Sequence, residues 1–420
     1  MVKNRFSIAV IPAIGLCLFL MLSWVAAAVY SSLADLAFND PFSTVWAYFT
    51  PSGSGTLIAV SCLGLIASAL FPSKGPHLEG SLRALSRQIS SQSSMWLVLA
   101  VSGLVSLALA KGPYLFYASS YLQFVAPQAF VSIANLAAPV AVLAAGVASS
   151  KFRTFGVVIF AILMMVLFAY STRLEAAAPA IFIAGRWLAG MKIGKRGLLF
   201  ASVSAVVLLP VPLFTRGLRE HGMLPYWTGV TENLPRVFDG GYLELLGNIG
   251  FTAPIAEYTW RAAAPIPAAA YWASIDPGLG GSSDFSIWAS YLRAHFFIPY
   301  SLIGEFAQTG LLGLFLAMLA LGLIWRFSIS IIANSQSGFG RISLVVALGL
   351  ICISALYCTQ YNTRSVARIL WLLIGLTAVV GVTSLIDRAH HSKSLSNNAR
   401  QKRIPLPSAR NSKYAPRSSK

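Results

Sequence analysis

Charged residues are scarce in this chain of 420 residues, and acidic residues are the scarcer kind. Only 10% of the residues are charged, 13 Asp and Glu stand against 31 Lys and Arg, and 56% of the residues are hydrophobic. The mean hydropathy is +0.70. A soluble globular domain has about 25% charged residues and a disordered chain has few apolar ones, so this composition excludes both classes. It is typical of a polytopic membrane protein.

Cysteine is also rare, and several motifs that carry chemistry are absent. The cysteines Cys17, Cys62, Cys352 and Cys358 all fall in apolar stretches, so they indicate neither a disulfide framework nor a metal site. The sequence has no Asp-x-Asp pair on a loop, no His-Glu-x-x-His, no Gly-x-x-x-x-Gly-Lys and no Gly-x-Ser-x-Gly. These absences argue against nucleotide-driven pumping, zinc hydrolysis and a metal-dependent sugar-nucleotide transferase. We expect no metal and no cofactor.

Long apolar segments are what the sequence has instead. Each is near the roughly 17–25 residues that a spanning helix needs, so we expect an all-α polytopic membrane protein with about ten transmembrane helices. A long polar and aromatic segment, 215–300, separates the seventh span from the eighth. The expected spans are 6–30, 54–72, 95–111, 128–150, 154–171, 176–191, 198–214, 301–325, 343–359 and 366–386.

These spans divide the chain into four expected parts. The first is a membrane bundle over 1–214, and the second is the large loop 215–300. Membrane hairpins follow over 301–386, and the basic tail 387–420 has too few apolar residues to form a core, so we expect it to be disordered. Within the large loop, the sequence predicts short helices over Val237–Gly250 and Asp284–Phe297.

Lys and Arg are distributed unevenly between the two sides of these spans. With the N-terminus inside, twelve of them lie in short loops on one face and four on the other. The positive-inside bias therefore places both termini in the cytoplasm and segment 215–300 outside. The formal net charge is +18, but nine basic residues follow Asp387. Anionic lipid headgroups explain this placement, so we expect membrane lipids and no nucleic acid as partners.

Arginines near the extracytoplasmic face are the first candidates for a binding site, because the positive-inside bias disfavours them there. A guanidinium binds phosphate through paired hydrogen bonds and stays charged at any working pH. We predict that arginines from several loops converge on a lipid diphosphate; the alternative is ion pairing with nearby carboxylates. The predicted diphosphate-binding residues are Arg173, Arg216, Arg219, Arg261, Arg293 and Arg364.

Aromatic residues and two ionisable groups complete the predicted site. Aromatic rings suit the C–H faces of sugars, although a Trp and Tyr belt at the membrane interface is the alternative. His295 is a candidate base for a sugar hydroxyl, although a lone histidine is more often structural. Glu305 lies early in the eighth span, where an ionisable group is a functional candidate by default. The predicted glycan-binding residues are Trp260, Trp272, Trp288 and Tyr300.

Three short stretches carry a family resemblance. Residues 170–173 read Tyr-Ser-Thr-Arg, residues 299–301 read Pro-Tyr-Ser, and residues 310–313 read Gly-Leu-Leu-Gly. Together they resemble the Ser/Thr-Arg, Pro-His-Asn and Gly-x-x-Gly motifs of Wzy-type polysaccharide polymerases and the related O-antigen ligases. Arg364 or Arg368 matches the late arginine of this family. Tyr300 stands where the family has histidine, so a basic role moves to His295 or is absent.

The resemblance implies an enzyme in the inner membrane of a bacterium that acts on the periplasmic face. It would polymerise undecaprenyl-diphosphate-linked oligosaccharide repeat units, for O-antigen, capsule or exopolysaccharide, by metal-independent glycosyl transfer with diphosphate as the leaving group. The implied arginines hold the diphosphate, and His295 or Glu305 takes the proton of the acceptor. The implied partners are the lipid-linked oligosaccharide, a flippase and a chain-length regulator.

Two other functions remain open at this stage. An O-antigen ligase or another lipid-linked glycan transferase would share the fold and differ in its acceptor. A polysaccharide or lipid transporter would also be polytopic, but it is expected to have interrupted helices in paired positions, whereas the polar residues here gather in one outer loop.

Overall fold

Long apolar helices make up most of the structure, a computed structural model. It describes residues 10–33, 41–71, 86, 89–261, 263–277, 287–288, 290–295, 298–335 and 338–401. Within these residues, 8 helices are long and apolar enough to cross a membrane, which confirms the predicted class of an all-α polytopic membrane protein. They cover Ile11–Leu33, Pro51–Leu70, Ser93–Leu115, Gln128–Ala148, Lys195–Arg216, Leu311–Ala333, Ile342–Gln360 and Thr363–Ile386.

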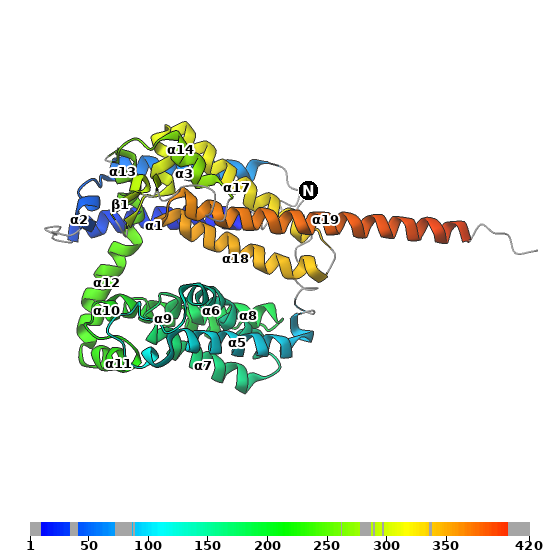
Figure 1. The fold of residues 1–420 in the computed structure, drawn as a ribbon, viewed down its shortest axis with the longest axis horizontal. Helices are drawn as coiled ribbons and strands as arrows, with labels where there is room; N and C mark the ends of the chain where they lie inside the picture. The colour runs from blue at the N-terminus through cyan, green and yellow to red at the C-terminus, as the bar shows by residue number, and fades with distance from the viewer. Residues whose placement is uncertain are drawn as a thin grey trace, which may run out of the picture.

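The helices form two bundles, each with its own apolar core (Figure 1). The terminal bundle contains both ends of the described chain, and the central bundle contains its middle. The terminal bundle consists of α1 (Ile11–Leu33), α3 (Pro51–Leu70), α17 (Leu311–Ala333), α18 (Gly338–Gln360) and α19 (Thr363–Gln401). The central bundle consists of α5 (Ser93–Lys111), α6 (Gln128–Ala148), α7 (Arg153–Ala169), α8 (Leu174–Leu188) and α9 (Lys195–Leu208).

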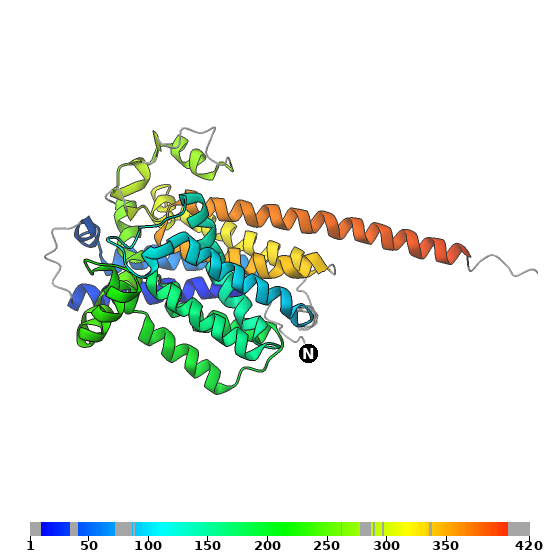
Figure 2. The ribbon, with the colours of Figure 1, turned by 60° about the horizontal axis from the view of Figure 1, so that its bottom comes forward.

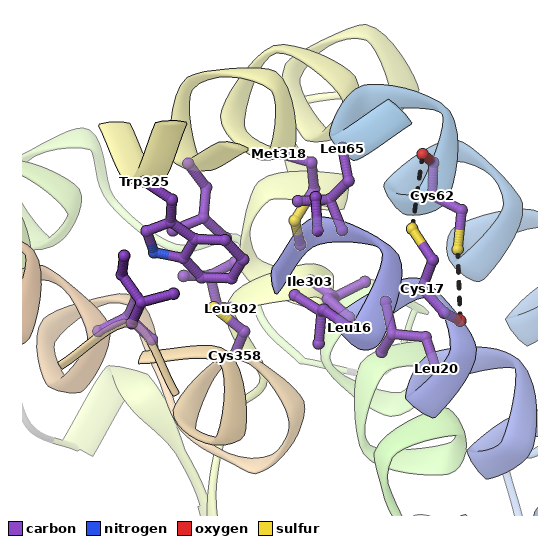
Figure 3. Close-up of a cluster of buried hydrophobic side chains, with 14 of the residues drawn as sticks. Leu16, Cys17, Leu20, Cys62, Leu65, Leu302, Ile303, Met318, Trp325 and Cys358 are labelled. Atoms are coloured by element: carbon purple, nitrogen blue, oxygen red, sulfur yellow. Dashed lines mark hydrogen bonds between the residues drawn. The ribbon is translucent and has the colours of Figure 1, made fainter. Parts of the chain in front are cut away.

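Close packing of α1, α3 and α17 forms the core of the terminal bundle. Figure 3 shows Leu20, Leu65 and Trp325 among the side chains of this core, and all three are almost completely buried. Two reciprocal contacts join α1 to α3: the Cys17 thiol donates to the Cys62 carbonyl at 3.8 Å, and the Cys62 thiol donates to the Cys17 carbonyl at 3.9 Å. Both cysteines are free thiols.

Small residues allow the helices of the central bundle to approach each other closely. Gly146 of α6 and Gly185 of α8 face each other, so that a Cβ atom on either glycine would collide with the backbone of the opposite helix. Glycine at such contacts lets helix backbones come together where lipid supplies no hydrophobic driving force. The α6–α8 interface therefore depends on the absence of side chains at these two positions.

One helix, α12 (Leu234–Gly250), connects the two bundles (Figure 1). Short elements gather at the same end of the molecule, while α1 begins and α19 ends at the opposite end (Figure 2). These elements include α2 (Pro41–Trp46), α10 (Val211–Arg216), α11 (Met223–Glu232), α13 (Thr252–Arg261), α14 (Ala268–Ile275) and β1 (Arg293–His295). The remaining ones are η2 (Gly112–Leu115), η3 (Ser290–Leu292), β2 (Ile298–Pro299) and α16 (Leu302–Gln308).

The fifth, sixth and eighth predicted spans differ in detail from the structure. The fifth and sixth correspond to α7, with 17 residues, and α8, with 15 residues, and neither is among the eight helices that are long and apolar enough to cross a membrane. The predicted eighth span, 301–325, is divided into α16 and α17. Gly310 separates them with a φ of 101°, a left-handed conformation that glycine adopts without strain. The spanning helix therefore begins at Leu311.

The large loop and the tail also differ from the predictions. The helix predicted over Val237–Gly250 is confirmed as α12, which begins at Leu234. The helix predicted over Asp284–Phe297 is wrong for residues 293–295, which form β1 and pair antiparallel with β2; much of the rest lies outside the described residues. In the tail, α19 continues to Gln401, so residues 387–401, expected to be disordered, are helical, whereas 402–420 lie outside the described residues.

The close contact between α6 and α8 predicts a sharp effect of adding a side chain. Gly146→Val puts branched methyl groups against the backbone of α8, so we expect it to destabilise the folded protein by more than about 2 kcal/mol and to lower its melting temperature in detergent. Gly349→Val in α18, where a Cβ meets nothing within 4 Å, is the matched control. Equal melting temperatures of the two variants would contradict this account of the interface.

Candidate functional site

A cavity of about 530 Å³ lies where the two bundles meet, beside α12. One part of its wall is aromatic: Trp46 lies 4.7 Å from Tyr30 and 6.4 Å from Phe251, measured between ring centroids. Phe42 and Tyr361 extend this wall. The polar side chains that line the cavity are Arg173, Glu244, Asn248 and Gln360.

Arg173 is the one predicted diphosphate-binding residue among those that line the cavity. It precedes α8, and its Nη2 donates a hydrogen bond to Asn248 Oδ1 of α12. The main-chain oxygen of Asn248 accepts a second hydrogen bond, from Gln360 Nε2 of α18, at 2.9 Å. Asn248 therefore connects the central bundle, through Arg173, with the terminal bundle, through Gln360.

A second predicted arginine, Arg216, lies next to Arg173. Its Nε donates to the carbonyl of Ser171 at 3.0 Å, and its guanidinium lies 5.7 Å from the ring centroid of Tyr121. Burial and the positive charge of Arg216 lower the pKa of Arg173, while Tyr361 acts in the opposite direction. Among the described residues, no carboxylate forms an ion pair with either arginine. The two guanidiniums therefore concentrate positive charge beside the cavity.

The turn between α7 and α8 holds Arg173 in place. Ser171 in this turn has a φ of 50°, which is uncommon for a residue with a side chain. Its hydroxyl lies 3.0 Å from the Pro212 carbonyl and 2.8 Å from Thr215 Oγ1, both in α10. These contacts fix the turn against the helix that carries Arg216. Strain of this kind persists where surrounding structure imposes it and clusters at functional sites.

Behind the arginines lies a buried polar and aromatic cluster that the sequence analysis missed. Lys111 is completely buried, and its Nζ donates to the Tyr121 carbonyl at 2.7 Å. His221 Nδ1 lies 3.0 Å from the hydroxyl of Tyr226. Burial and the charge of Lys111 lower the pKa of His221, which favours the neutral imidazole. The position of His221 shortly after Arg216 was the only available signal in the sequence.

Two other predicted arginines have structural partners elsewhere. Arg261 forms an ion pair with Glu257 Oε1 at 3.1 Å, and its guanidinium lies over the ring of Trp260. Glu257 also accepts hydrogen bonds from the backbone N–H and the hydroxyl of Thr50, so this group joins α13 to the start of α3. Arg364 Nη1 donates to the Ala273 carbonyl at 3.0 Å and joins α19 to α14.

The remaining two predicted arginines do not line the cavity. Arg219 is exposed between α10 and α11. Arg293 is exposed on β1, where its Cα pairs with that of Pro299. Pro299 itself lines the cavity, so β1 lies one strand away from it. Of the six predicted arginines, Arg173 and Arg216 therefore lie together, whereas the other four lie elsewhere.

The two predicted bases also lie outside the cavity lining. His295 is exposed on β1. Glu305 is completely buried in α16, and its Oε2 accepts hydrogen bonds from the backbone N–H of Thr363, at 2.7 Å, and from the Thr363 hydroxyl. A carboxylate at the start of α19 complements the helix dipole. In the structure Glu305 therefore caps the last spanning helix, and its other oxygen has no hydrogen-bond partner among the described residues.

The predicted glycan-binding residues lie around α13 and α14 and not in the cavity wall. Trp260 packs against the core of the terminal bundle, and Tyr300 is buried 6.4 Å from the Tyr258 ring. Trp288 contacts Tyr291, whereas Trp272 is 73% exposed. The aromatic wall consists of other rings, from α1, α2 and the ends of α12 and α18.

The cavity combines three chemical features. The guanidinium of Arg173, with Arg216 next to it outside the lining, attracts an anion, aromatic rings offer contact to sugar rings, and Glu244 supplies a carboxylate. Its volume falls within the roughly 300–1,000 Å³ of typical small-molecule sites. Because Glu244 and Asn248 are one helical turn apart in the predicted helix Val237–Gly250, the sequence places them on one face, but it does not say that this face meets Arg173.

The buried carboxyl of Glu305 predicts a dependence of stability on pH. Burial raises its pKa from 4.5 to about 7, against the lowering effect of the Thr363 hydrogen bonds. The folded state therefore binds the proton more tightly than the unfolded state, and the stability that the protonated carboxyl contributes is complete below pH 4.5 and lost as pH rises through 7. We expect the melting temperature in detergent to fall over this range and Glu305→Gln to reduce the slope.

Glu232→Gln is the control for this measurement, because Glu232 is exposed at the end of α11. Its slope should match that of the unmodified protein. If Glu305→Gln had the same slope as well, Glu305 would not be the group that titrates.

Comparisons of this chain with protein-family models, curated proteins and solved structures found no match.

Proposed function

We propose that this chain polymerises lipid-diphosphate-linked oligosaccharide repeat units by glycosyl transfer in the cavity between the two bundles. The observation that carries the proposal is the position of Arg173. This residue ends the Tyr-Ser-Thr-Arg stretch that resembles the polysaccharide polymerases, and it lines the cavity beside Arg216 without a carboxylate partner among the described residues.

The charge of the arginines suits the diphosphate. Hydrogen bonds from guanidinium to phosphate oxygens are charge-assisted and commonly paired. Arg173 at present donates to a neutral amide, Asn248 Oδ1, which a phosphate oxygen can replace as the stronger acceptor. As the bond from the sugar to the diphosphate breaks, negative charge develops on the departing oxygen, and preorganised guanidiniums stabilise it.

The aromatic wall suits the sugars. The rings of Tyr30, Trp46 and Phe251 line the cavity together with Arg173 of the central bundle. The donor diphosphate would lie at the arginines and its first sugars along the rings. In this proposal the aromatic wall takes the glycan-binding role that we predicted for Trp260, Trp272, Trp288 and Tyr300.

The proposed orientation places the cavity on the extracytoplasmic side. The short elements around the cavity lie at the opposite end from the start of α1 and the end of α19 (Figure 2). The positive-inside bias assigns both termini to the cytoplasm, so the cavity would open at the outer leaflet of a bacterial inner membrane. A lipid-linked oligosaccharide reaches this leaflet only after transfer across the membrane, which is why a flippase is an expected partner.

Loss of Arg173 tests the proposal. We expect a deletion strain to make glycans that carry single repeat units on their final carrier, and the unmodified gene to restore the ladder of long chains on electrophoresis. Arg173→Ala should restore no ladder and should bind geranylgeranyl diphosphate, used as a probe, about 10- to 100-fold more weakly, because a charge-assisted hydrogen bond is lost.

Arg196→Ala is the control, because Arg196 is exposed at the start of α9. It should restore the full ladder. A full ladder from Arg173→Ala would overturn the proposal. Unattached long polymer in the deletion strain would instead identify a ligase, which uses the same donor and a different acceptor.

A further inference from the structure

Glu244 presents a carboxylate to the cavity from α12. Its position is determined by the helix, because residues at spacings of three, four and seven share one helical face. The residues of α12 and its C-terminal end that line the cavity follow this spacing: Glu244, Gly247, Asn248 and Phe251. Gly247 lies next to the ring of Tyr30, so α12 packs closely against α1 and its orientation is fixed.

Asn248, on the same face of α12, connects Glu244 with Arg173. The Asn248 side chain donates to the Glu244 carbonyl at 3.0 Å and accepts from Arg173. One helical turn, about 6 Å along the axis, therefore separates Glu244 from the residue that contacts Arg173. The carboxylate forms no ion pair with either arginine among the described residues. The cavity thus holds an anion-binding group and a separate carboxylate within the length of a sugar unit.

No other described carboxylate lines this cavity. Glu305 is completely buried in α16 and accepts hydrogen bonds from Thr363, and Glu257 is engaged by Arg261 and Thr50. Glu244, in contrast, is exposed to the cavity, and its carboxylate oxygens form no hydrogen bond among the described residues. Partial desolvation in the cavity raises the pKa of Glu244, which makes its carboxylate a stronger base than a fully solvated one.

We propose that Glu244 is the catalytic base that accepts the proton of the acceptor sugar hydroxyl. This inference rests on the proposed function. Glycosyl transfer needs a group that binds the diphosphate and a group that deprotonates the acceptor hydroxyl, and the inference assigns a residue to the second role. It replaces His295 and Glu305, which do not line the cavity.

The step balances with these groups alone. The acceptor hydroxyl gives its proton to the Glu244 carboxylate, and its oxygen forms a bond to the anomeric carbon of the donor. The bond between that carbon and the diphosphate oxygen breaks, and its electron pair stays on the diphosphate, beside Arg173 and Arg216. Glu244 then returns the proton to solvent. Each cycle joins one repeat unit and releases one lipid diphosphate.

Binding and transfer must be measured separately to test this role. Membranes of the deletion strain contain the accumulated lipid-linked repeat units, and purified variants are added to them. We expect Glu244→Gln to bind geranylgeranyl diphosphate as the unmodified protein does and to lose transfer by about 100-fold or more, as for the loss of a general base. Glu244→Asp keeps a carboxylate and should retain part of the activity. Glu232→Gln, exposed on α11, should transfer normally.

The possible outcomes distinguish a failure of the Glu244 assignment from a failure of the proposed function. Transfer by Glu244→Gln within a few-fold of the unmodified protein would overturn the assignment of Glu244, while the loss of binding in Arg173→Ala would leave the proposed function intact. Equal losses in Glu244→Gln and Glu244→Asp together with weaker binding of the probe would identify a structural role and would also overturn it. If the unmodified protein extends no glycan, the proposed function fails, and the assignment of Glu244 fails with it.

Discussion

The contact between Arg173 and Asn248 joins the central bundle to α12, the helix between two bundles that are built around different cores. Asn248 belongs to α12, and its main-chain oxygen is held in turn by Gln360 of α18. This short series of hydrogen bonds, together with the packing of α12 against α1 and α10, therefore sets how the part of the wall with Arg173 lies relative to the aromatic rings. Because the partner of Arg173 is a neutral amide, the contact positions the guanidinium without neutralising it.

The turn between α7 and α8, which holds Arg173 in place, has a backbone conformation that is energetically unfavourable, and contacts with α10 offset this cost. A left-handed conformation costs a residue with a side chain roughly 1–2 kcal/mol. At Ser171 two hydroxyl contacts to α10 compensate, and its carbonyl accepts a hydrogen bond from Arg216. The turn thus brings both arginines to one place, where their mutual repulsion and partial burial favour an anionic ligand.

Local rules explain why some predicted residues lie elsewhere. Glu257 and Arg261 are four residues apart in one helix, a spacing that predicts an ion pair. The sequence therefore already contained the reason why Arg261 does not line the cavity. Glu305 lies in the short helix before α17, and the carboxylate reaches the start of α19, which is distant in the sequence. No local pattern indicates that second contact.

By itself, the sequence determined the membrane class, most of the spanning helices and the helix α12, and it named Arg173 as a candidate, because hydropathy, helical spacing and charge bias are properties of neighbouring residues. Only the tertiary structure decided which side chains meet in the cavity. Arg173 and Asn248 are 75 residues apart, and Asn248 and Gln360 are 112 apart. Their meeting depends on how two independently packed bundles and the helix between them are oriented, which no short stretch of sequence specifies.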